Sequence, residues 1–325
     1  MRAEGAFGGI EVYDVLRGER LFELPAGILS ADGTRHVTVS AGPHATTIRR
    51  YDARTGRLLG ASRVPGRWWT NAVSADGGRI VLADLVKGRR TATRLAVLDG
   101  TTGRVLRLVK LRGNLEAEAV SKDGRRLFLV QWLHGGYVVR GYDTRERRLA
   151  TIRAGGDPAV MRGAAWGSVA SPDGRWLLTL YLEPGGEIAI HALDIRRGRA
   201  ACIDLPAAPF EAAREYGFVV AGLVALAVNP KLGVVASIDL AKDRVAAVSR
   251  FRRAKEPGAV GIVGAMTGRH AAFAHGGSVW TYDLGSGAVA GPRDAGATLV
   301  GLAFTADGKA LLGVRADGRV LSLGR

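Results

Sequence analysis

Short runs of apolar and β-branched residues alternate along the whole chain with turns that are rich in Asp and Gly. Four of these turns read Ser, any residue, Asp and Gly, and a fifth begins with Thr; they are centred on Asp32, Asp76, Asp123, Asp173 and Asp307. In such a turn the Asp side chain accepts backbone N–H groups, and Gly adopts the left-handed conformation that a tight loop requires. The flanking runs, such as residues 35–40 and 126–130, are short and rich in Val, Leu and Phe, which predicts β-strands.

The turns repeat at a regular interval. The first four Asp residues are 44, 47 and 50 positions apart, and the gap of 134 residues before Asp307 predicts two degenerate turns, near Lys231 and Thr267. A second glycine turn follows the first in most units, as in residues 51–56 (YDARTG), 98–103 (LDGTTG) and 282–287 (YDLGSG). Two turns on one side of each unit indicate four strands per unit. The sequence therefore predicts an all-β, seven-bladed β-propeller of four-stranded antiparallel blades, in one domain over residues 1–325.

The Ser-x-Asp-Gly turn followed by the Tyr-Asp-x-x-Thr-Gly hairpin resembles the WD-repeat-like propellers of the YVTN and TolB types, over residues 9–325. The Trp-Asp dipeptide and the Gly-His opening of true WD repeats are missing. The resemblance implies a propeller platform, in a group that ranges from protein-interaction scaffolds to periplasmic binding proteins and sugar lactonases. It does not choose among these activities.

The two ends of the chain pose a question of closure. Residues 9–14 and 20–24 look like the third and fourth strands of a unit, whereas residues 299–304, 310–314 and 320–323 supply three strands of the last one. One strand is thus duplicated. We expect the N- and C-terminal strands to share the closing blade, since an unpaired edge exposes backbone donors and acceptors. The alternative is that upstream sequence is missing. As it stands the sequence indicates a cytoplasmic protein, whereas a missing upstream segment with an export signal would make it an exported one.

The irregular loops of the units are expected on the opposite face from the Asp-Gly turns, and binding residues concentrate in loops on a rigid scaffold. The longest connection is the insert at residues 205–217, whose residues 210–216 are expected to form one or two helical turns over the channel mouth. As a surface loop it is expected to be removable without unfolding the propeller. The binding candidates on this face are Trp68, Trp69, Asn71, Glu116, Glu118, Arg162, Trp166, Arg214 and Tyr216.

Each candidate has a structural alternative. The tryptophans can pack between blades, and the Glu and Arg side chains can form surface ion pairs. His44, His134 and His275 fall in loops of one face but belong to separate units, so no metal site is expected. Cys202 lies in an apolar run and is expected to be a buried, inert thiol.

Charge and motifs narrow the function only a little. The net charge of +16 reflects 39 arginines and seven lysines, spread along the chain, against 30 acidic residues. The sequence has no nucleotide-binding motif, no nucleophile elbow of a hydrolase and no zinc-protease motif. No run is long enough for a transmembrane segment. We therefore expect a non-catalytic binding or protein-interaction propeller, monomeric and without a cofactor, whose partner is a protein or small molecule rather than nucleic acid. The alternatives are a hydrolase or lactonase-type enzyme with carboxylates at the channel mouth, or polyanion binding through the scattered arginines.

Overall fold

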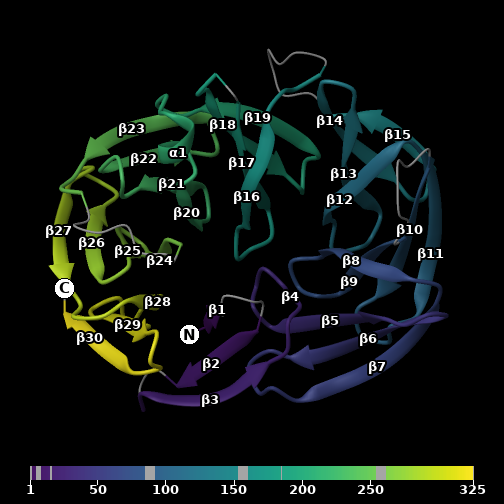
Figure 1. Cartoon of the computed structure of the whole chain (residues 1–325), viewed down its shortest axis with the longest axis horizontal. Helices are drawn as coiled ribbons and strands as arrows, with labels where there is room; N and C mark the ends of the chain where they lie inside the picture. The colour runs from purple at the N-terminus through teal and green to yellow at the C-terminus, as the bar shows by residue number, and fades with distance from the viewer. Residues whose placement is uncertain are drawn as a thin grey trace.

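The strands of this protein form a ring of sheets (Figure 1). The computed structural model describes residues 2–4, 9–14, 17–84, 92–152, 160–183, 185–253 and 261–324. In these ranges the chain forms eight antiparallel sheets, each a meander in which consecutive strands pair, with the first strand innermost and the last outermost (Figure 1). The fold is therefore the expected all-β propeller architecture.

The strands of the successive sheets have the following bounds. The first three sheets comprise β1 (Arg2–Glu4), β2 (Ile10–Asp14) and β3 (Glu19–Leu24); β4 (Ile28–Leu29), β5 (Arg35–Ala41), β6 (Ala45–Asp52) and β7 (Leu58–Pro65); and β8 (Trp68–Val73), β9 (Arg79–Asp84), β10 (Ala92–Asp99) and β11 (Val105–Arg112). The next two comprise β12 (Asn114–Val120), β13 (Arg126–Leu133), β14 (Gly136–Asp143) and β15 (Arg148–Thr151); and β16 (Ala164–Ala170), β17 (Trp176–Leu182), β18 (Ile188–Asp194) and β19 (Arg199–Asp204). The last three comprise β20 (Gly217–Ala221), β21 (Val224–Asn229), β22 (Val234–Asp239) and β23 (Arg244–Arg250); β24 (Val263–Thr267), β25 (His270–His275), β26 (Ser278–Asp283) and β27 (Val289–Asp294); and β28 (Leu299–Phe304), β29 (Leu311–Arg315) and β30 (Val320–Gly324).

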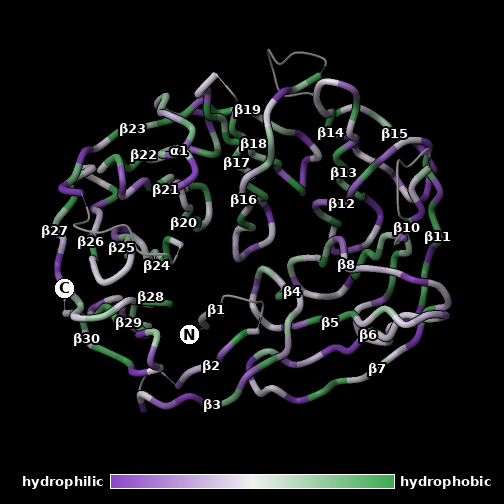
Figure 2. Tube along the Cα trace, in the orientation of Figure 1, coloured by the Kyte–Doolittle hydropathy of each residue, from purple (hydrophilic) through white to green (hydrophobic). Residues whose placement is uncertain are grey.

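The core lies between the faces of neighbouring sheets. Every residue of the middle strand β17 is buried, and its sequence, WLLTLYL, is almost continuously apolar because both of its faces are covered. The outer strand β11 is exposed along most of its length and alternates Leu with Arg and Lys. Figure 2 shows the same contrast, with hydrophobic stretches recurring in the middle strands of successive sheets.

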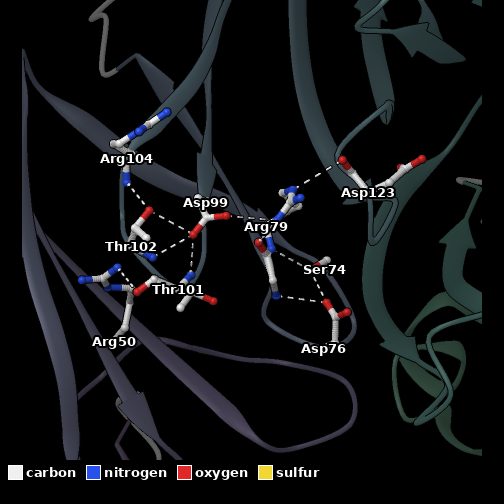
Figure 3. Close-up of polar contacts among 10 residues, drawn as sticks. Arg50, Ser74, Asp76, Arg79, Asp99, Thr101, Thr102, Arg104 and Asp123 are labelled. Carbon is white, nitrogen blue, oxygen red and sulfur yellow. Dashed lines mark hydrogen bonds and ion pairs between the residues drawn. The ribbon is translucent and has the colours of Figure 1, made fainter.

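The Asp-Gly turns form as the sequence indicates. Asp76 accepts hydrogen bonds from the Ser74 hydroxyl at 2.8 Å and from the backbone N–H of Gly78 at 3.0 Å (Figure 3). Gly77, between them, has a φ of 70°, in the left-handed region. The same backbone bond runs from Thr34 to Asp32, from Arg125 to Asp123 and from Arg175 to Asp173.

These turns define two faces, which are named here by their connections. The turn face carries the connections from first to second and from third to fourth strands. The loop face carries the connections from second to third strands and from one sheet to the next. The turn near Thr267 joins β24 to β25 on the turn face, as expected. The turn near Lys231 joins β21 to β22, so it lies on the loop face and its placement as a first turn is wrong.

The expected count of seven blades is not confirmed, because six sheets have four strands and two have three. The closing blade shared by both ends is wrong for the described strands: β1–β3 form one sheet and β28–β30 another. The reason is that β30 pairs with β29 and so takes the third-strand position of the last sheet. The β2–β3 hairpin would need that same position in order to join the sheet. The two sheets meet through side chains instead, with Tyr13 packed against Val314.

Candidate functional site

The insert on the loop face is built into the hydrophobic core. It contains α1 (Phe210–Ala213), a single helical turn as expected from the sequence. The buried Asn229 donates from Nδ2 to the Ala212 carbonyl at 2.7 Å and accepts the backbone N–H of Leu232 at 3.0 Å. The expectation of a removable surface loop is contradicted, because one apolar core cluster includes the buried insert residues Leu205, Ala208, Ala212, Ala213 and Tyr216.

Trp166 and Arg214, two of the predicted residues, lie together. The indole Nε1 of Trp166 donates to the Arg214 carbonyl at 3.1 Å, and the Arg214 guanidinium lies 4.3 Å from the centroid of the same ring. Phe210 of α1 meets this ring edge-on at 6.3 Å. The pairing of β16 with β17 shifts between Ala165 and Gly167, so Trp166 is the extra residue of a bulge. The insert is therefore clamped onto the innermost strand of its preceding sheet.

A pocket of about 430 Å³ opens on the loop face between the β12–β15 and β16–β19 sheets. Tyr137 and Tyr181 line it, with rings stacked 4.5 Å apart. The remaining lining residues are Met161, Arg162, Glu183, Glu187, Ile188, Ala189, Cys202, Asp204, Leu205 and Ala207. The walls thus include the start of the insert and the connection between β17 and β18.

The charges around this pocket are mostly negative. Three carboxylates, Glu183, Glu187 and Asp204, face a single guanidinium, that of Arg162, in a chain whose net charge is +16. Burial raises the pKa of Glu183, and the hydrogen bond with Glu187 and the charge of Glu187 raise it further, while Arg162 opposes them. A cation placed beside Glu183 would favour its ionised form and so oppose the effects of burial and of Glu187.

Glu118 lies between the same two sheets as the pocket, where Tyr181 donates to its Oε1 at 3.5 Å. Burial raises the pKa of Glu118 to about 7, aided by the charge of Glu116 and opposed by the Tyr181 hydroxyl. His191 stands with its ring edge against Tyr181 at 6.3 Å, and burial lowers its pKa to about 4. This group of titratable side chains adjoins the pocket through Tyr181.

The remaining predicted residues serve mainly the scaffold. Trp68 is buried and donates from Nε1 to the Pro65 carbonyl at 2.7 Å. The Asn71 Oδ1 accepts the backbone N–H of Ala117 at 2.6 Å and so ties β8 to β12. Tyr216 is buried, which raises its pKa to about 12. Trp69 is 38% exposed but belongs to a different sheet from the pocket.

Three features of the pocket were missed or misjudged from the sequence. Tyr137 and Tyr181 come from adjacent sheets, and only their packing brings them together. Glu183 and Glu187 flank a short hairpin on the expected face, so the charge density of that loop was the available signal. Cys202, expected to be buried, is partly exposed at the pocket wall, with its sulfur 3.9 Å from that of Met161. In the described ranges no group of three or more His, Cys, Asp or Glu side chains is arranged to hold a metal ion.

Comparison with known proteins supports the fold and goes no further. No protein-family model and no curated relative matches the sequence. Among solved structures, the chain is similar to the Dos1 propeller with 13% identity and a TM-score of 0.54, covering 95% of this chain and 79% of that one. It is similar to the dihydro-heme d1 dehydrogenase NirN with 17% identity and a TM-score of 0.54, covering 96% and 67%.

A third similar structure is apo AztD from Citrobacter koseri, with 13% identity and a TM-score of 0.52, covering 93% of this chain and 96% of that one. Likenesses at this level of identity concern the backbone alone. No helix in the described ranges has the length and apolarity needed to cross a membrane. The chain has a β-propeller fold, in agreement with the resemblance of its turns to WD-repeat-like and TolB-type propellers.

Proposed function

We propose that this protein is a non-catalytic binding propeller whose loop-face pocket takes a cationic group, an ammonium or guanidinium carried by a small molecule or a peptide side chain. The observation that carries the proposal is the lining of the pocket, in which the carboxylates of Glu183, Glu187 and Asp204 outnumber the single guanidinium beside the stacked tyrosines. A cation placed among these carboxylates makes charge-assisted hydrogen bonds with them.

The pocket chemistry supports a cation over an anion. An anion of the same size would meet three carboxylates and one arginine, and like charges in a partly enclosed site repel strongly. The walls supplied by Met161, Leu205 and Ala207 favour a cation on a short apolar stem. The pocket volume of about 430 Å³ matches a small molecule or one long side chain.

The test is calorimetric titration with putrescine and agmatine, with glutarate as the anionic probe. We expect saturable binding of the two cations and none of glutarate. The variant Glu183→Gln keeps the shape of the side chain and removes its charge, and it should weaken binding about tenfold or more. Glu19→Gln, an exposed carboxylate on β3, is the matched control and should leave binding unchanged. Equal loss in both variants, or binding of glutarate, would refute the cation pocket.

A hydrolase is the second candidate, and the raised pKa of Glu183 favours it, because a carboxyl that holds its proton more strongly than usual is better suited to act as a general acid. The two candidates separate on turnover. A non-catalytic binder releases N-acetylputrescine and lactones unchanged, whereas a hydrolase cleaves the amide or the lactone at a rate that Glu183→Gln abolishes.

A further inference from the structure

A second pair of hollows lies on the turn face, away from the pocket just described. One, of about 370 Å³, is lined by the turn at residues 120–126 together with Gly174, Ile195 and Arg196. The other, of about 440 Å³, lies between β13–β15 and the turn at residues 197–199. Both include Arg125 and Arg126, so the two hollows adjoin. We call them together the turn-face groove.

The lining of the turn-face groove is strongly basic. Its cations are Lys122, Arg125, Arg126, Arg148, Arg196, Arg197 and Arg199, against the carboxylates of Asp123, Asp143 and Glu146. Seven cations against three carboxylates give a local excess of positive charge, which arginines spread evenly along the sequence did not predict. The fold gathers them because two turns distant in sequence face each other across one inter-sheet space.

Part of this charge has no carboxylate partner. Arg125 pairs with Asp143 at 2.9 Å, and Arg199 pairs with Asp243 at 2.9 Å. No carboxylate of the described chain comes within ion-pair distance of four exposed groove cations, namely Lys122, Arg126, Arg196 and Arg197. Exposed, uncompensated cations that converge on a hollow attract anions and raise their local concentration.

The extra cations are departures from the repeat. The third-to-fourth-strand turns at residues 99–103 (DGTTG) and 283–287 (DLGSG) carry no basic residue, whereas residues 194–198 read DIRRG and residues 143–147 read DTRER, each with two arginines. Likewise, residues 121–126 read SKDGRR, while residues 74–79 read SADGGR. The turn geometry does not require these substitutions, because the other turns form without them.

The backbone that presents the two turn arginines is held firmly. Asp194 is fully buried, accepts the backbone N–H of Arg197 at 3.0 Å and pairs with Arg175 at 3.1 Å. On the other side, Arg126 donates from Nη1 to the Arg196 carbonyl at 3.4 Å. A firmly held backbone lowers the ordering cost of binding a ligand.

We infer that the turn-face groove binds an oligophosphate, an anion with several phosphate groups in a row. Arginine forks match phosphate oxygens in bidentate fashion, and two adjoining hollows suit an extended anion better than a single phosphate. A nucleic acid also carries phosphates in a row, but the aromatic side chains of the groove, Phe128 and Tyr142, are buried. They therefore offer no exposed face on which a base could stack.

The test measures binding of tripolyphosphate, orthophosphate, citrate and a ten-nucleotide thymidine strand by calorimetry at two salt concentrations. The groove variant is the triple Arg126→Gln, Arg196→Gln and Arg197→Gln. The matched control is the triple Arg63→Gln, Arg107→Gln and Arg112→Gln, which removes the same charge from exposed positions of the outer strands β7 and β11.

We expect tripolyphosphate to bind at least about tenfold more tightly than orthophosphate or citrate, and the groove triple to lose that binding. The control triple should retain it, and the thermal unfolding midpoints of the variants should show that both fold. Equal losses in the two triples would show that net charge alone attracts the anion and would overturn the inference. Tighter binding of the thymidine strand than of tripolyphosphate would also overturn it, in favour of nucleic acid. Because Glu183 lies on the opposite face, Glu183→Gln should not change tripolyphosphate binding, so the two proposals fail independently.

Discussion

The substitution Asn229→Ala tests whether the insert is part of the folded core. Asn229 is fully buried, and its amide satisfies the Ala212 carbonyl at 2.7 Å and the Leu232 backbone N–H at 3.0 Å. Two net hydrogen bonds contribute about 1–3 kcal/mol, and the buried Ala212 carbonyl left without its partner adds a desolvation cost of at least about 1 kcal/mol. We therefore expect the free energy of unfolding to fall by about 2–4 kcal/mol.

The assay is urea unfolding followed by tryptophan fluorescence and far-UV circular dichroism together. Asn114→Ala is the matched control, because Asn114 begins β12 and has no side-chain hydrogen bond to the described residues. It should change the free energy of unfolding by less than about 0.5 kcal/mol. A loss below about 1 kcal/mol for Asn229→Ala, with an unchanged dependence on urea, would show that the insert is an independent surface loop.

Three further predictions follow from single contacts. Asp76→Ala removes the hydrogen bonds from Ser74 and Gly78 and should lower the free energy of unfolding by about 1 kcal/mol in urea titrations. Cation binding should be retained, and loss of binding at full stability would argue against a purely structural turn. Because the folded-state pKa of Glu118 is raised to about 7, the folded protein holds more protons than the unfolded chain below that pH, so stability falls as pH rises from about 4.5 to 7. Glu118→Gln should flatten this decline, and an unchanged pH profile would exclude Glu118 as its source. Trp166→Ala removes the ring under Arg214 and should speed amide hydrogen exchange across residues 210–216 without altering exchange in β24–β27; uniform acceleration would contradict a local clamp.

The turns were predictable because their chemistry is local. An Asp two residues before a backbone N–H makes the same bond wherever the chain places it, and Asp32, Asp123 and Asp173 all do so. The prediction for the turn near Lys231 was wrong for the same reason. An Asn-Pro sequence suits a reverse turn on either face, and only the strand order shows that it follows β21.

The pocket depended on contacts that no local pattern encodes. Tyr137 and Tyr181 are far apart in sequence, and each reads as one more apolar residue of a middle strand. Asn71 and Glu118 were predicted in loops at the entry of inner strands, whereas bulges within β8 and β12 direct both toward the next sheet, and Glu118 meets Tyr181 there. Candidate residues could be located from the repeat, whereas the direction of their side chains could not.

The separation of the first and last sheets has a kinetic consequence. Since every described sheet is built from consecutive strands, each can form from a continuous stretch of nascent chain, and the contacts within it close only short loops. The ring is then completed by the approach of two finished sheets, at Tyr13 and Val314, with no strand exchanged between them. Such a seam separates by losing side-chain packing alone, so it is where transient opening of the ring should begin and where a protease would first find an exposed strand edge.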